Sequence, residues 1–312
     1  MKIGLDIMGG DNAPQATLEG AYLAKKALDN KAKIVLFGDK NMALNWFSEN
    51  NIDSSFFDFV HTEQTIEMNE HATKALRKKP NNSISMGFKA LRDKEIDVFS
   101  SAGNSGAMLV GSMFSIGPIK GVIRPSITSV LPKENGSVGL ILDVGVNADC
   151  KPDVLFQFAI LGSLFAENIY KIKNPKVGLL NIGEEKGKGN LLTQSAYELL
   201  EDNEDINFIG NVEGRDLFNN KADVIVCDGF TGNVVLKQAE SFYELITKRK
   251  LIDSYFDRFN YEIYGGTPVL GLDGNVLMGH GISNSTAIKN MLLLGKDLIN
   301  SQLTSKIKTA FK

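Results

Sequence analysis

The sequences VGLLNIGEEKGKGN at residues 177–190 and DVIVCDGFTGNVVLK at residues 223–237 decide the fold of this chain. In each, a short apolar run is followed by a polar loop with glycines and by an asparagine, Asn190 or Asn233, that opens a helical pattern. This order predicts a strand that leads into a helix, twice in succession. Parallel strands end at one edge of a sheet, where α/β proteins bind their ligands. We therefore predict that the two loops form the floor of an anion site.

The same alternation extends over most of the chain. Strands are predicted at 1–7, 33–37, 56–60 and 97–100 and within 264–274 and 276–284. Helices are predicted from Pro14, as the first helical residue, to about 28, from Asn104, and at 42–47, 72–79, 83–91, 154–169, 234–246 and 286–299. The runs 126–131 and 138–144, joined by PKENG, predict an antiparallel hairpin. We expect an α/β/α sandwich with a mostly parallel, mixed sheet, as one domain over 1–312 or with two lobes.

Composition excludes several classes of protein. The chain is 43% hydrophobic and 23% charged, which is typical of a soluble globular enzyme. A formal charge of −3 argues against a protein that coats nucleic acid, because that function needs a basic surface. The two cysteines, Cys150 and Cys227, are far apart, so the sequence shows neither a disulfide framework nor a zinc motif. We expect a cytoplasmic protein, because KIGLDIMGGD at the start is a strand and turn without an apolar signal stretch.

Five loops share glycines, a polar group and an asparagine near a helix start. They are GGDN from Gly9, AGNSG from Ala102, GKGN from Gly187, GFTGN from Gly229 and GHGISN from Gly279. Glycine lets the backbone approach a ligand, and a helix N-terminus directs partial positive charge at it, so these loops together predict a phosphate site on one rim. The alternative is that glycine and asparagine only form turns.

Known cofactor and nucleophile motifs do not fit. GEEKGKG is one residue short of a phosphate-binding P-loop, and no G-x-G-x-x-G follows the first strand, so a nicotinamide or ATP site is the weaker alternative. The sequence also lacks G-x-S-x-G and H-E-x-x-H, and three histidines make a histidine metal site unexpected. The absence of a protein nucleophile suggests that inorganic phosphate itself attacks an acyl thioester, a reaction that needs mainly positioning and charge stabilisation.

Particular side chains suit that reaction. Lys188, between two glycines, is the candidate that holds phosphate, while Asn233 and Asn104 could hold the thioester carbonyl or a phosphate oxygen. His280 could move a proton, and Asp228 could orient Lys188 or bind a polar group of the ligand, so both are predicted substrate-binding residues. The alternatives without a functional role are that Lys188 is a solvent-exposed lysine, that His280 only bonds the backbone of a turn, and that Asp228 only caps a helix. The remaining predicted substrate-binding residues are Gly103, Gly106, Gly187, Gly189, Asn190, Gly229 and Gly232.

At these residues the chain resembles the bacterial phosphate acyltransferases of phospholipid synthesis. The resemblance rests on LDIMGGDNAP from Leu5, SAGNSGAM from Ser101, RPSI from Arg124, LDVGVNADCKP from Leu142, QFAILGS from Gln157, GLLNIGEEKGKGN from Gly178, NFIGNVEGRD from Asn207, DVIVCDGFTGNVVLK from Asp223, IYGGTPVLG from Ile263 and GHGISN. It implies transfer of a fatty acyl group from acyl-[acyl carrier protein] to inorganic phosphate, giving acyl phosphate. It also implies the fold of phosphate acetyltransferases and the isocitrate dehydrogenase group, a homodimer, no metal or nucleotide cofactor, and reaction at Lys188 and Asn233.

The resemblance further implies a downstream membrane glycerol-3-phosphate acyltransferase as recipient of the product. Residues 238–263 are shorter than the helical hairpin of that family, so helix packing is favoured over peripheral membrane contact there. The basic group Lys74, Arg77, Lys78 and Lys79 could dock the acidic carrier protein, although a solvated helix face is the simpler interpretation. Three other functions stay open: a short-chain acyltransferase using acyl-CoA, a nicotinamide-dependent dehydrogenase, and a scaffold that binds carrier protein without turnover.

Overall fold

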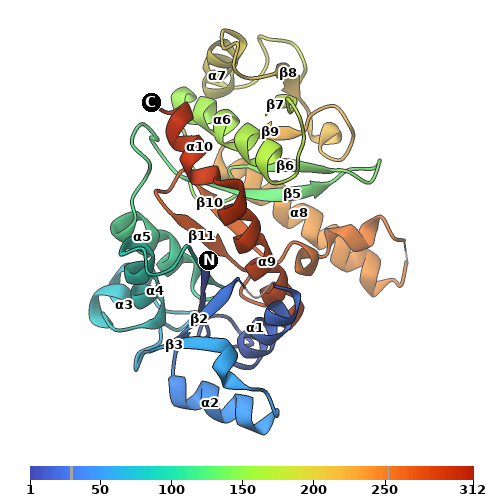
Figure 1. Cartoon of the computed structure of the whole chain (residues 1–312). Coiled ribbons are helices and arrows are strands. Elements are labelled where there is room, and N and C mark those ends of the chain that lie inside the picture. Colours follow the sequence, from blue (N-terminus) through green and yellow to red (C-terminus); the bar gives the residue numbers. More distant parts are fainter. Residues whose placement is uncertain (29–30, 252) are drawn as a thin grey trace. The chain divides into compact units, whose positions relative to one another are not determined.

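A computed structural model describes residues 1–28, 31–251 and 253–312, which divide into two compact units. Unit 1 comprises Met1–Gly117 with Tyr261–Thr304, and unit 2 comprises Pro118–Asn260 with Ser305–Lys312 (Figure 1). Each unit contains mostly parallel strands with helices packed on them, so the predicted mixed α/β fold is confirmed. A single domain over the whole chain stays a prediction.

The strands of unit 1 follow the order β3-β2-β1-β4-β11-β10. They are β1 (Lys2–Asp6), β2 (Lys33–Gly38), β3 (Phe57–His61), β4 (Val98–Ser101), β10 (Thr267–Leu270) and β11 (Asn275–Met278). Neighbours run parallel except for β10, which is antiparallel to β11. The central strands are buried on both faces, as expected for parallel strands covered by helices.

Helices cover both faces of the unit 1 sheet. They are α1 (Gln15–Ala27), α2 (Lys40–Glu49), α3 (Ala72–Lys78), α4 (Ser83–Arg92), α5 (Ser105–Ser115) and α9 (Ser285–Ser301), with the short helices η1 (Ser54–Phe56) and η4 (Tyr261–Ile263). In β4, Val98 packs against Gly295 of α9, whereas Phe99 packs against Gly87 of α4. Because consecutive strand residues point to opposite faces, α9 and α4 lie on opposite sides of the sheet.

The strands of unit 2 follow the order β5-β6-β9-β7-β8. They are β5 (Ser126–Pro132), β6 (Val138–Leu142), β7 (Val177–Leu180), β8 (Phe208–Val212) and β9 (Val224–Val226). The predicted antiparallel hairpin is β5 and β6, and the other neighbours are parallel. The two stretches that decide the fold provide β7 and β9, which pair directly with each other.

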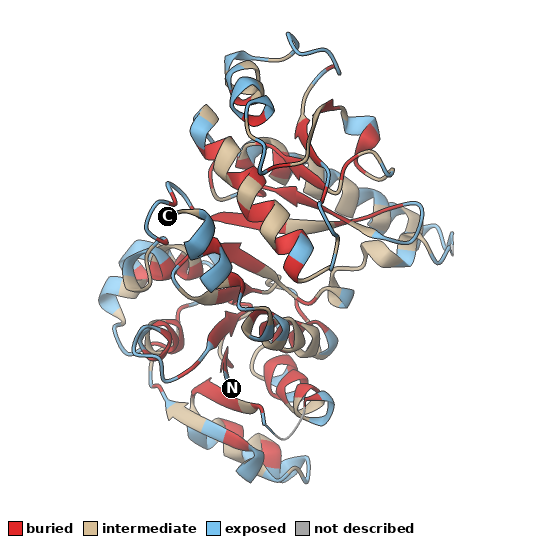
Figure 2. Cartoon of the chain, turned by 45° about the horizontal axis from the view of Figure 1, so that its top comes forward, coloured by how far each residue is buried: buried red, intermediate tan, exposed pale blue. Residues whose placement is uncertain are grey.

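The helices after these strands are α6 (Pro152–Asn168), α7 (Leu191–Glu201) and α8 (Gly229–Lys248), with η2 (Gly214–Asp216), η3 (Phe256–Phe259) and the C-terminal α10 (Leu303–Ala310). Figure 2 shows the strands buried and the outer sides of many helices exposed. None of the helices in the described ranges combines the length and the apolar character that crossing a bilayer requires.

Two predictions about element boundaries are wrong, and one strand and one α-helix were not predicted. Asn233 does not open a helix, because α8 begins at Gly229 and the Asp228 carboxylate caps it by accepting a hydrogen bond from the Thr231 amide. GFTGN is therefore the first turn of a helix and not a loop, although its glycines suggested one. Pro14 is the N-cap of α1 and not its first residue. Strand β8 and helix α10 were not predicted at all.

Candidate active site

The loop after β6 is organised by the buried carboxylate of Asp143. Its oxygens accept hydrogen bonds from the amides of Ile127 (2.9 Å), Val144 (2.9 Å), Val146 (3.2 Å) and Asn147 (2.6 Å), from Asn147 Nδ2 (3.0 Å) and from Ser126 Oγ (3.3 Å). Burial raises the pKa of the Asp143 carboxyl, and these hydrogen bonds act in the opposite direction. Since these six donors converge on it, the carboxylate fixes the backbone of residues 143–147.

The first turn of α8 packs directly on this loop. The Gly229 amide donates to Asn147 O at 2.8 Å, and a Cβ added at Gly229 would lie 2.7 Å from Asp143 Oδ2. A Cβ added at Gly232 would lie only 2.0 Å from Asp143 O. These two glycines are therefore required for close approach of helix and loop, and their predicted contact with substrate stays a prediction.

A pocket of about 430 Å³ lies where α7 and α8 begin, at the carboxyl ends of β7 and β9. It is lined by Leu155, Leu180, Asn181, Ile182, Gly189, Asn190, Thr193, Cys227, Asp228 and Thr231. Asn190 caps α7 through the Thr193 amide (2.9 Å), and Asp228 caps α8 through the amide and hydroxyl of Thr231 (both 2.8 Å). The positive ends of two helix dipoles therefore border the pocket and favour an anion, while the Asp228 carboxylate in the same lining offsets part of this potential.

Side-chain amides hold the GEEKGKG loop beside this pocket. Asn181 Nδ2 donates to Lys188 O (3.1 Å), Gln194 Nε2 to Gly187 O (2.9 Å) and Gly189 O (3.2 Å), and Asn211 Nδ2 to Glu185 O (3.0 Å). Gly189 has φ of +94°, and a Cβ there would lie 2.3 Å from Asn181 Oδ1. Asn181, Gln194 and Asn211 were not among the predicted site residues, although Asn181 is a polar residue at the end of an apolar run.

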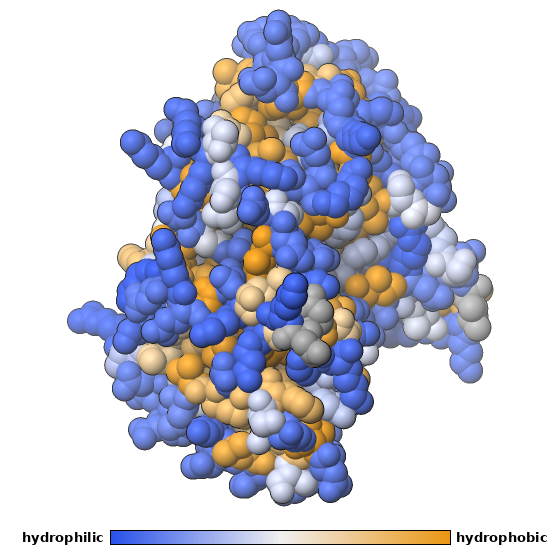
Figure 3. All heavy atoms as spheres, viewed as in Figure 1, coloured by the Kyte–Doolittle hydropathy of each residue, from blue (hydrophilic) through white to orange (hydrophobic). Residues whose placement is uncertain are grey.

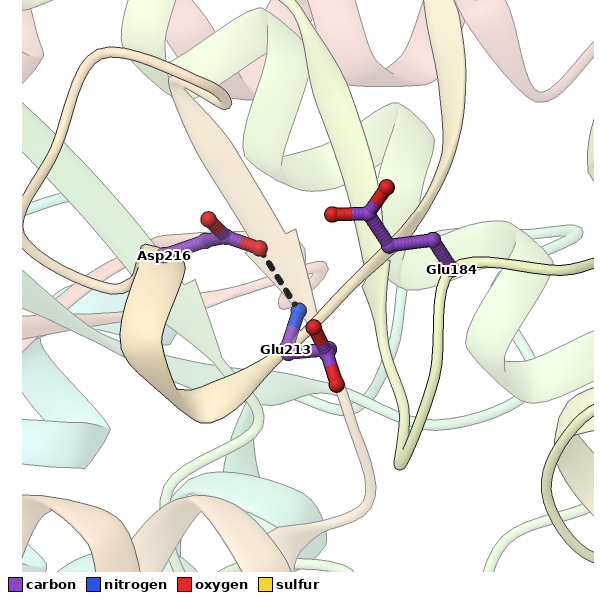
Figure 4. A group of neighbouring side chains, drawn as sticks. All are labelled: Glu184, Glu213 and Asp216. Carbon is purple, nitrogen blue, oxygen red and sulfur yellow. Dashed lines mark hydrogen bonds between the residues drawn. The ribbon is translucent and has the colours of Figure 1, made fainter.

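Three carboxylates gather at the base of the same loop: Glu184, Glu213 and Asp216, with ligand atoms within 4.8 Å of one another (Figure 4). Lys221 Nζ bridges Glu184 (2.6 Å) and Asp216 (3.0 Å), and Arg215 pairs with Glu213. The hydrogen bond that Lys221 donates to Glu184 is the main reason that the pKa of Lys221 is raised. A metal ion would have to displace these cations, so the cluster acts as a clamp between the loop and η2.

Lys188 and Asn233 are not among the residues that line this pocket, although each is close in sequence to a lining residue, Gly189 or Thr231. Lys188 is exposed, and its stem lies over Gly183, where an added Cβ would be 2.9 Å from Lys188 Cγ. Asn233 is half-buried, with Nδ2 3.0 Å from a Cβ added at Gly145 of the Asp143 loop. Both residues belong to unit 2, and their action on one substrate stays a prediction.

In unit 1, three of the five glycine loops meet one another. A Cβ added at Gly9 would lie 2.7 Å from the Gly103 amide, and the Asp11 amide donates to Gly281 O at 2.8 Å. GGDN, AGNSG and GHGISN therefore gather in unit 1, while GKGN and the start of α8 gather in unit 2. The prediction that all five share one rim stays a prediction.

The predicted ligand groups of unit 1 have structural partners. Asn104 caps α5, and its Nδ2 donates to the carbonyls of Glu67 and Glu70, both at 2.9 Å, so its amide is already engaged. The half-buried His280 ring lies against Tyr261, with centroids 5.2 Å apart. Roles of Asn104 and His280 in substrate binding, and of Gly103 and Gly106 beside them, stay predictions.

The two cysteines are unfavourable nucleophiles. Burial, together with the charges of Asp143 and Asp228, raises the pKa of the half-buried Cys150 thiol to about 11. Cys227 lines the pocket, but burial raises the pKa of its thiol well above the usual value. At neutral pH both thiols are therefore protonated, which leaves little of the reactive thiolate.

Comparisons with known proteins identify relatives over nearly the whole chain. The family described as "Fatty acid synthesis protein" matches residues 1–252. The phosphate acyltransferase of Dictyoglomus turgidum (strain DSM 6724 / Z-1310) is 41% identical over 327 residues, which cover 98% of this chain and 96% of the relative.

Solved structures share the fold at low sequence identity. A phosphotransacetylase from Streptococcus pyogenes superposes with a TM-score of 0.70 at 15% identity, covering 98% of this chain and 94% of the other. A 4-hydroxythreonine-4-phosphate dehydrogenase from Klebsiella pneumoniae gives a TM-score of 0.56 at 10% identity, covering 96% and 98%. At such identities the likeness concerns the fold alone, and it confirms the expected fold group.

Asp143→Asn should lower the free energy of unfolding by about 1–3 kcal/mol, because an amide nitrogen would face backbone donors that now have an acceptor. Urea denaturation at neutral pH measures this loss. The matched control is Asp202→Asn, at an exposed helix end. Equal stability of Asp143→Asn and the unsubstituted protein would contradict the organising role of this carboxylate.

Cys150 should react with iodoacetamide at a rate that rises about tenfold per pH unit between pH 8 and 10, because only the thiolate reacts and the pKa of this thiol is about 11. Mass spectrometry of the labelled peptide follows the rate, with Cys150→Ala as the blank. A plateau of the rate near pH 9 would show an ordinary thiol instead.

Proposed function

We propose a function for this chain from one premise: it belongs to the phosphate acyltransferase family. The reaction is transfer of a fatty acyl group from acyl-[acyl carrier protein] to inorganic phosphate, giving acyl phosphate for phospholipid synthesis. A phosphate oxygen forms a bond to the acyl carbon, the carbon–sulfur bond breaks, and the carrier leaves as a thiol after taking up a proton. No covalent bond between the acyl group and the enzyme forms during this reaction.

The unit 2 pocket is the observation that carries the proposal. Two helix N-termini border it, which suits a phosphate dianion, and its other side is apolar through Leu155, Leu180 and Ile182, which suits an acyl thioester. Cys227, the one thiol in the lining, has a pKa that disfavours a covalent intermediate. The arrangement therefore supports direct attack by phosphate that is held and oriented by the protein.

Two side chains are assigned to the transition state. Lys188 is exposed and extends from a loop fixed by three amides, so its ammonium is available to a phosphate oxygen. Asn233 is anchored on the Asp143 loop through Gly145, and its Nδ2 is a donor suited to the developing negative charge on the thioester oxygen. Both groups stabilise charge and neither forms a bond to the substrate.

Lys188→Ala and Asn233→Ala should each lower kcat by about 100-fold to 1,000-fold, the usual effect of removing one charge-stabilising donor. Acyl phosphate formed from acyl carrier thioester and phosphate, measured by mass spectrometry, gives the rate. Lys186→Ala is the control, because Lys186 lies in the same loop but pairs with Glu201 on the surface.

The same assay separates the rival functions. A preference for acyl-CoA would indicate a short-chain acyltransferase, and an absorbance change with nicotinamide cofactor and a hydroxy acid would indicate a dehydrogenase. Full activity of Lys188→Ala, or an acyl group bonded to the protein during turnover, would contradict the mechanism. A carrier scaffold would bind the thioester without phosphate-dependent turnover.

We extend the proposal to a homodimer formed through α8. Val234, Phe242 and Leu245 on this helix are 50%, 56% and 51% exposed. Their spacing of eight and three residues places them on one side of the helix. An apolar stripe of this kind is costly in water and is stabilised by a second copy. A membrane glycerol-3-phosphate acyltransferase is the proposed recipient of the product. Because a second copy would cover the stripe, helix packing is favoured over peripheral membrane contact of this cytoplasmic enzyme.

Leu245→Glu should shift the protein from dimer to monomer, because the new carboxylate would have to be buried without a partner. Sedimentation velocity at micromolar concentration measures the change. Thr247→Glu adds the same charge on the opposite, exposed side of α8 and should leave the dimer intact. A monomer in the unsubstituted protein would refute the dimer proposal.

A further inference from the structure

Helices α3, α4 and α5 of unit 1 form an apolar groove on the protein surface. A hollow of about 300 Å³ is lined by Thr73, Leu76, Arg77, Ser85, Phe88, Val110, Gly111, Phe114 and Ser115. Phe114 at the end of α5 is 85% exposed, and Met113 beside it is 42% exposed. Such exposed, large apolar side chains beside a hollow are typical of a surface that binds another protein.

The groove is surrounded by positive charge. Exposed cations on α3 and α4 are Lys74, Arg77, Lys78, Lys89 and Arg92, and none of the sequences of α3, α4 and α5 contains an aspartate or glutamate. Arg92 pairs with Asp93 just after α4, at 3.0 Å, so Lys89 is the cation of α4 that has no ion pair within the described part of the chain. Figure 3 shows hydrophilic residues projecting from the side of unit 1 that carries α3. Because the whole chain has a formal charge of −3, this excess of positive charge is local.

One member of the predicted basic group has another role. Lys79 Nζ pairs with Glu70 at 2.6 Å and donates to Thr65 O at 2.7 Å, so it holds the segment before α3. The hydrogen bond from Lys79 is the first cause of the lowered pKa of Glu70. The cations available to a partner on α3 are therefore Lys74, Arg77 and Lys78.

We propose that this groove is the docking site of the acyl carrier protein, which presents an acidic helix with apolar residues along its edge. The proposal rests on the proposed function, which makes a carrier protein the acyl donor. A helix with one apolar edge fits into the hollow beside Phe114, while its carboxylates meet the cations of α3 and α4. The apolar centre favours a protein helix over a nucleic acid backbone, which would need only charge.

Binding is the first test, because it does not depend on turnover. Lys74→Glu/Arg77→Glu should weaken binding of labelled acyl carrier protein about tenfold in fluorescence anisotropy at low salt, since two attractive pairs become repulsive. The control is Lys173→Glu/Lys176→Glu, two exposed lysines with the same spacing in unit 2. Phe114→Ala should also weaken binding, and this loss should not depend on salt concentration because the lost contact is apolar. The Phe114 side chain is exposed, so a folding defect is not expected.

Turnover is the second test and separates this proposal from the proposed function. The double variant should show a raised KM for acyl carrier thioester with an unchanged KM for phosphate, and an unchanged rate with an acyl-pantetheine thioester, which has no carrier protein. Carrier binding equal to that of the unsubstituted protein in both variants would overturn the docking site. Absence of acyl phosphate with either donor would instead overturn the proposed function, and the binding measurement would still decide the docking site.

Discussion

The buried carboxylate of Asp143 is the constraint on which the geometry of unit 2 depends. An ionised carboxylate inside a protein is destabilising by several kcal/mol unless it is fully hydrogen-bonded. Here six donors from the backbone and side chains of two neighbouring segments surround it. The loop after β6 can hardly change shape without leaving this charge unpaired. Gly229 and Gly232 transmit that rigidity to α8, because they fit against the loop only at one separation.

The opposite border of the pocket is fixed by different chemistry. Neutral amides from Asn181, Gln194 and Asn211 bind the carbonyls of the GEEKGKG loop, and Lys221 clamps its base to η2. These neutral donors hold the loop without adding charge of their own, so the potential at the pocket is set by the two helix N-termini and by the Asp228 carboxylate in the lining. The backbone of the GEEKGKG loop is held by these amides and by Lys221, while the side chain of Lys188 remains exposed to solvent and accessible to an anion.

Elements with strong local signals were predictable from sequence, and contacts between distant segments were not. The strands that become β7 and β9, the hairpin of β5 and β6, and the caps Asn104 and Asn190 follow from apolar runs and turn chemistry. The predicted start of α8 was wrong, because Gly229 and Gly232 are residues typical of loops. In the structure they are helical glycines that leave room for the Asp143 loop, where a side chain would not fit. Likewise, nothing local in the sequence indicates that the Asn104 amide is engaged by Glu67 and Glu70.

Electrostatics explains how a chain of net negative charge could act on the two anionic substrates proposed above. Phosphate and an acidic carrier protein would both be repelled by a uniformly negative surface, yet a uniformly positive one would also attract nucleic acid and other polyanions. In this chain the proposed positive potential is confined to two local regions. In unit 2 the proposed sources of positive potential are oriented backbone dipoles and the exposed Lys188, which act over a few ångströms. In unit 1 it comes from the cations of α3 and α4 around an apolar hollow, so that charge attracts a partner and shape selects it.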